Sequence, residues 1–164
     1  GFIAMSHHFP RALGLLAALL ALTLTACGGG ASNAAPFDPE STAQALLDSG
    51  AFSEPLEEMS VDLACGTLYD IDAEAVTGCA VYTSLTAGAE EIAVLTFNSE
   101  DAASSALEAL EQRVADQRAA LENYQPQEVS KLDGAILEQR GNSVLLAVAE
   151  DASAAQAVLD TLAE

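Results

Sequence analysis

The spacing of apolar positions divides the chain into an apolar N-terminal run and a longer part in which helix and strand patterns alternate. In the longer part, apolar residues recur three and four positions apart in four segments, a spacing that predicts amphipathic helices. These segments are residues 38–50, 60–69, 100–123 and a last one that begins at Asp151 or Ser153 and runs to Leu162. Shorter segments rich in apolar and β-branched residues predict strands. The predicted strands are residues 78–85, 91–97, 135–140 and 143–149.

Turn and capping residues support these boundaries. Asp38-Pro39-Glu40 combines a capping side chain, a proline in the first turn and an early acid, and Gly50 is a typical end of a helix. Asn98-Ser99 stands before the longest predicted helix in a similar capping position. Gly141-Asn142 favours a type II′ turn between the last two strands, because glycine accepts the positive φ of the first central position.

The predicted order of elements is ααββαββα, with a hairpin on either side of the long helix. Two hairpins favour one four-stranded antiparallel sheet with the helices packed on it, so we expect a two-layer α+β fold. Residues 143–149 do not alternate cleanly between apolar and polar side chains, which predicts a central strand buried on both faces. Residues 38–164 are long enough for a single domain with a modest core.

The N-terminal apolar run is typical of a bacterial lipoprotein leader. Residues 12–26 are almost all Ala and Leu, a run that suits a signal peptide and is shorter than the roughly 20 residues a membrane-spanning helix needs. Leu24, Thr25 and Ala26 precede Cys27 as a signal-peptidase recognition sequence would, and three glycines follow. We therefore expect residues 1–26 to be a signal peptide, with Met5 as the initiator and Cys27 as the lipidated residue. An uncleaved membrane anchor or a plain secretory leader is the alternative.

Lipidation would fix the location of the protein. Two acyl chains hold a protein stably on a bilayer, whereas one chain holds it only marginally. Residues 27–37 are small and rich in Gly and Ala, which predicts a flexible tether between Cys27 and the domain. The expected location is the extracytoplasmic face of the cell membrane, with the membrane itself as one partner through the lipid on Cys27.

Charge excludes several classes of partner. All 25 acidic residues follow Cys27, and the four basic residues that oppose them leave a net charge of −21 after the leader. These basic residues are Arg113, Arg118, Lys131 and Arg140. A nucleic-acid partner is excluded, because phosphate binding needs clustered Lys and Arg. Anionic headgroups would repel this surface, so we expect no second membrane contact.

The chemistry-bearing residue types are few. Both histidines, His7 and His8, lie in the leader, so the mature chain holds neither a Ser-His-Asp nor a Cys-His arrangement. Cys65 and Cys79 are predicted either to form a disulfide, as an even pair outside the cytoplasm often does, or to be two small buried thiols. Their spacing does not indicate a metal site. We expect no cofactor.

Residues 70–74 resemble the start of a calcium-binding loop, with acids at alternating positions. Ala75 stands where an EF-hand needs glycine and Val81 where it needs a bidentate acid, so an EF-hand is excluded. An irregular calcium site and a capped loop before a strand remain as alternatives.

Several segments, taken in order and spacing, resemble a family of small bacterial lipoproteins known as domain of unknown function 4358. These segments are residues 45–52, 68–72, 90–94, Tyr124-Gln125-Pro126, Lys131-Leu132 and Gly141-Asn142 before an apolar strand. The resemblance covers roughly residues 42–162 and implies a cell-surface lipoprotein. It implies no assigned activity, cofactor or catalytic residue, and the two cysteines do not belong to its pattern.

Three hypotheses for function follow from these observations. The favoured one is a non-enzymatic binding or interaction module that is held at the membrane face and contacts an envelope protein or an extracellular ligand. The second is a lipid-anchored hydrolase that uses paired carboxylates, one of them with a raised pKa. The third is a structural spacer.

Overall fold

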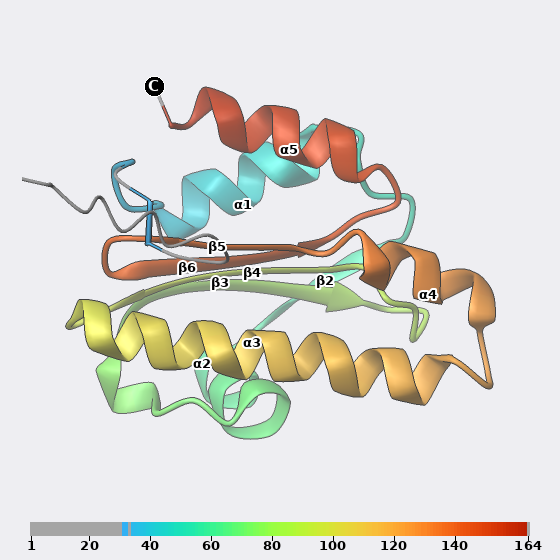
Figure 1. The fold of residues 1–164 in the computed structure, drawn as a ribbon, viewed down its shortest axis with the longest axis horizontal. Coiled ribbons are helices and arrows are strands. Elements are labelled where there is room, and N and C mark those ends of the chain that lie inside the picture. Colours follow the sequence, from blue (N-terminus) through green and yellow to red (C-terminus); the bar gives the residue numbers. More distant parts are fainter. Residues whose placement is uncertain (1–30, 33, 164) are drawn as a thin grey trace, which may run out of the picture.

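The fold is taken from a computed structural model, which describes residues 31–32 and 34–163. Its centre is one six-stranded sheet with the strand order β1-β5-β6-β4-β3-β2 (Figure 1). All neighbouring strands are antiparallel except β1, which runs parallel to β5. The strands are β1 (Ala31–Ser32), β2 (Leu56–Met59), β3 (Val76–Ser84), β4 (Glu91–Phe97), β5 (Ile136–Arg140) and β6 (Ser143–Val148).

Helices cover both faces of this sheet, as Figure 1 shows. On one face, α1 and α5 pack on a core that includes Leu46, Ile92 and Leu145. On the other face, α3 and η1 pack on a second core that includes Leu95 and Leu110. The helices are α1 (Pro39–Asp48), α2 (Val61–Leu63), η1 (Ala64–Tyr69, a π-helix), η2 (Ala73–Ala75, a 3₁₀-helix), α3 (Glu100–Leu121), α4 (Pro126–Asp133) and α5 (Ala152–Thr161).

The α+β class is confirmed, but the two-layer arrangement is wrong because the domain has three layers. The reason lies in the central strands β4 and β6, which are buried on both faces. Alternate side chains of a strand point to opposite faces, so Val94 and Leu145 need cover on one side and Leu95 and Leu146 on the other. The expectation that residues 143–149 form a central strand is confirmed, since β6 lies between β5 and β4.

The four-strand prediction is also wrong. Both predicted hairpins are present, as β3–β4 and β5–β6, but β2 extends the sheet beyond β3 and β1 extends it beyond β5. Ala31 and Ser32 of β1 pair with Gln139 and Arg140, and the Phe37 side chain is buried. The domain therefore begins inside residues 27–37, which the sequence assigned to the tether. The helix α4 was not predicted either.

Capping side chains begin three of the long helices where the sequence places them. Asp38, Ser99 and Asp151 each accept a hydrogen bond from a backbone N–H of the first turn. Such a cap contributes about 1 kcal/mol, because it satisfies a donor that the helix leaves free. Gly141, with a φ of 57°, makes the turn between β5 and β6.

Within the described residues, none of the helices combines the length and the apolar character that crossing a membrane requires.

Candidate functional site

The predicted signal-peptidase recognition sequence Leu24-Thr25-Ala26 and the predicted lipidation site Cys27 lie outside the described residues. The first described residues after it belong to β1, which pairs with the end of β5 next to the Gly141 turn. The chain therefore enters the domain at that end of the sheet.

The opposite end of the sheet holds a lysine surrounded by carboxylates. The Lys131 Nζ lies 2.8 Å from Glu90, 3.1 Å from Glu128, 3.2 Å from Glu150 and 3.7 Å from Glu54. We call these five residues the Lys131 cluster. They come from α4, from the segments before β2 and β4, and from the residue that follows β6 and Ala149. Of these five side chains, only that of Glu150 is substantially exposed. The ion pairs of the cluster are therefore largely buried, and they connect four parts of the chain.

Neutral donors complete the cluster. Glu90 accepts hydrogen bonds from the backbone and hydroxyl of Ser53, both at 2.7 Å, and Glu54 accepts them from Ser84 and Thr86. A Cβ at Gly88 would lie 1.7 Å from the Glu54 Oε1 atom, so any larger residue there would displace the Glu54 carboxylate. The buried carboxylates are thus held in place by neutral hydrogen-bond donors as well as by their ion pairs with Lys131.

The environment favours the charged forms of two members of the cluster, Glu90 and Lys131. Burial alone would raise the pKa of Glu90, but hydrogen bonds from Lys131 and Ser53 outweigh burial and hold the pKa below its usual value. Burial would likewise lower the pKa of Lys131, but its hydrogen bonds to Glu90, Glu128 and Glu150 raise it well above the usual value. An ionised Glu90 does not suit a general acid, which needs a raised pKa. A lysine held in its charged form is a poor nucleophile.

A second buried group of charges lies on the α3 face of the sheet. The Arg113 guanidinium on α3 donates to the Glu91 carboxylate at 2.8 and 3.3 Å, and the Tyr69 hydroxyl donates to the same carboxylate at 2.9 Å. Burial, reinforced by the negative charge of Glu91, raises the pKa of Tyr69 well above its usual value. The three groups satisfy one another and connect η1, β4 and α3.

Cys65 and Cys79 are free thiols in the structure and belong to the same core. Burial is the main cause, and the neighbouring Cys65 the second, that raises the pKa of the Cys79 thiol to about 11. Burial and the charges of Asp62 and Asp72 also raise the pKa of Cys65. The disulfide stays a prediction, with two buried thiols as the alternative.

The segment that resembles the start of a calcium loop has another local role. Asp72 caps η2 by accepting a hydrogen bond from the backbone of Glu74, and Asp70 adopts a left-handed conformation with a φ of 54°. Over residues 31–32 and 34–163, no group of three or more His, Cys, Asp or Glu side chains is arranged to hold a metal ion.

A family model described as a domain of unknown function (DUF4358) matches residues 53–149, and the chain belongs to this family. The resemblance identified from the sequence is confirmed by this match. The matched region contains four members of the Lys131 cluster and both Glu91 and Arg113. No curated protein and no solved structure matches the chain.

The Lys131 cluster is not evident in the sequence because its glutamates lie far apart in the chain. A signal was nevertheless present in the composition, since only four basic residues accompany 25 acids after the leader. A basic residue that stands among apolar positions becomes buried, and buried Lys and Arg side chains are almost always paired with carboxylates. In such an acidic chain these carboxylates can come from distant segments.

Proposed function

We propose that the protein is a lipid-anchored, extracytoplasmic binding module that contacts another component of the cell envelope. The N-terminal run that ends in Cys27 and the glycines after it support the anchor. Membership of a family without an assigned activity is compatible with this proposal.

The pairing of the buried charges supports binding rather than catalysis. Among the described residues, the buried carboxylates Glu90, Glu91 and Glu128 each bond to a basic side chain of the same fold. A hydrolase that uses two carboxylates needs one of them protonated near neutral pH, yet Glu90 has a lowered pKa. These paired charges stabilise the fold. Binding to other molecules is therefore assigned to the surface of the domain.

Metabolic labelling tests the anchor. Cells that express the full-length protein are fed a fatty acid with a clickable end group, and the Cys27→Ala variant is the control. Label on the wild type and none on the variant is expected. Equal labelling of the two proteins, or none on either, would contradict lipidation at Cys27.

Crosslinking in cells tests the binding role. The wild type is crosslinked beside a matched chain in which residues 1–37 carry an unrelated folded domain, and attached proteins are identified by mass spectrometry. An envelope protein attached to the wild type alone is expected. Identical crosslinking patterns would leave the spacer hypothesis as the better account.

A further inference from the structure

A groove runs along one side of α3, formed by three hollows of about 200, 320 and 240 Å³. The first and second share Asp70 and Ala109, and the second and third share Leu68 and Arg113. Because neighbouring hollows share lining residues, they lie side by side in a row along the helix. We call this row of hollows the α3 groove.

One face of the helix forms one wall of the groove. The contributing α3 residues extend from Ala102 to Gln117 and recur three and four positions apart. At 1.5 Å of rise per residue, this wall is about 22 Å long. A fully extended peptide rises about 3.3 Å per residue, so six or seven residues would fill the groove.

The other wall comes from the end of η1, from the segment after it and from the β3–β4 turn. Leu68 and Ile71 supply apolar surface, and small side chains such as Ala109 on the helix leave the space open. An extended peptide places alternate side chains on opposite sides, so apolar residues at every second position can enter such a groove.

The charge of the groove is negative. Asp70, Asp72 and Asp116 line it and are exposed. The basic residue in the groove, Arg113, is bound to the buried Glu91, so its charge is compensated within the fold. The negative charge of the whole domain attracts a cationic partner over long distances, and the rim carboxylates add a local interaction.

From these observations we infer that the α3 groove binds an extended segment of a partner protein in which Lys or Arg alternates with apolar residues. This inference rests on the proposed binding function and adds to it a site and the chemistry of the partner. The apolar residues of the segment lie against Leu68 and Ile71, and its basic residues pair with the rim acids.

Binding of a defined peptide to the full-length protein in neutral-lipid nanodiscs tests the groove. The probe is a fluorescein-labelled decapeptide of alternating Lys and Val, and fluorescence anisotropy gives its Kd at physiological ionic strength. The Ala109→Trp variant fills the shared part of the groove, whereas Ala115→Trp places the same side chain on an exposed position of α3 that lines none of the hollows. We expect the Ala109→Trp variant to bind at least tenfold more weakly and the Ala115→Trp variant to bind as the wild type does.

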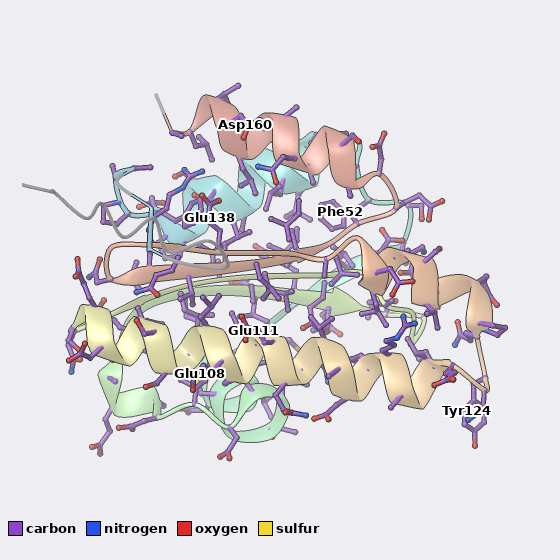
Figure 2. All side chains as sticks on the ribbon, viewed as in Figure 1. Phe52, Glu108, Glu111, Tyr124, Glu138 and Asp160 are labelled. Carbon is purple, nitrogen blue, oxygen red and sulfur yellow. The ribbon has the colours of Figure 1, made fainter. Side chains whose placement is uncertain are left out.

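A second pair of variants separates local from overall charge. Asp70→Asn with Asp72→Asn removes two charges at the rim and keeps side chains able to cap η2. Glu111→Gln with Asp160→Asn removes two charges elsewhere, on α3 and on α5 (Figure 2). The rim pair is expected to weaken binding several-fold more than the control pair. Circular dichroism melting curves confirm that all four variants fold.

Three results would overturn the inference. They are an absence of peptide binding, equal effects within each pair of variants, and equally tight binding of a peptide with Glu in place of Lys. The crosslinking experiment then distinguishes failure of the groove assignment from failure of the proposed binding function. If Ala109→Trp keeps the envelope partner of the wild type, the binding function stands and the groove assignment fails. If the wild type has no partner, the binding function itself fails.

Discussion

The ammonium of Lys131 lies 2.8 Å from the carboxylate of Glu90, although 41 residues separate the two in the chain. Glu90 has no exposed side-chain surface, and Lys131 is only 11% exposed. This contact ties α4 to the segment that leads into the central strand β4.

Replacing Lys131 by methionine should destabilise the domain strongly. Lys131→Met keeps most of the side-chain volume but leaves buried carboxylates without their cation. Loss of one partner of a buried ion pair typically costs about 3–5 kcal/mol of unfolding free energy. Urea denaturation measures the loss, and Lys131→Met combined with Glu90→Gln should recover part of it. A loss below about 1 kcal/mol would show that the cluster contributes little net stability.

Stability should fall on acidification below about pH 4.5. The pKa of Glu90 in the folded protein is lower than its ordinary value of 4.5, so the unfolded chain binds a proton first as the pH falls. The contribution of Glu90 is fully present above pH 4.5 and is lost between that pH and the lower pKa of the folded state. Urea midpoints between pH 3 and pH 6 measure this dependence. The Glu90→Gln variant should show a shallower slope than the wild type, and equal slopes would contradict the assignment.

Removing the Tyr69 hydroxyl should lower stability by about 1.5–3 kcal/mol, the usual contribution of a hydrogen bond to a charged group. Tyr69→Phe deletes the donor at 2.9 Å from Glu91 while the ring stays in the core. Tyr124→Phe is the matched control, because Tyr124 is 86% exposed in the turn between α3 and α4 (Figure 2). Thermal or urea unfolding should show a loss for Tyr69→Phe and almost none for Tyr124→Phe. Equal stability of the two variants would contradict the role of the hydroxyl.

Thiol labelling should separate the two alternatives for Cys65 and Cys79. If both are free, iodoacetamide should react slowly with the folded protein at pH 8, because burial raises the pKa of Cys79 to about 11, and rapidly after unfolding. If they form the predicted disulfide, the unfolded protein should take up label on these cysteines only after reduction. Mass spectrometry of the two peptides reports which outcome holds.

Local patterns could be predicted from the sequence, and long-range arrangements could not. The position of β4 follows from the apolar run between Ile92 and Leu95, and the start of α3 follows from the capping residue Ser99. The sequence of β2, Leu-Glu-Glu-Met, does not alternate, and its position depends on pairing with β3. The eight residues of α4 are too few for a clear helical period.

The layers and the candidate site were missed for a related reason. The sequence of an amphipathic helix shows that the helix has an apolar face but not which face of the sheet it covers. The sequence therefore could not show that α1 and α5 cover one face and α3 the other. The Lys131 cluster draws on four segments whose proximity exists only after the sheet has formed. The residues of the α3 groove were visible in the sequence, yet the open space between Ala109 and Leu68 depends on tertiary packing.

The pairing of Ala31–Ser32 with the end of β5 limits how far the domain can move from the bilayer if Cys27 is lipidated as proposed. The four Cα–Cα steps from Cys27 to Ala31 span at most about 14 Å when fully extended. The domain would therefore stay close to the surface of the membrane that holds it. Gln139 on β5 bonds to the start of α3, which places that end of the helix near β1, where the chain enters the sheet. Such a short tether would raise the effective concentration of partners that are held on the same membrane. A weak intrinsic affinity would then suffice for membrane-bound partners, whereas soluble partners would bind poorly.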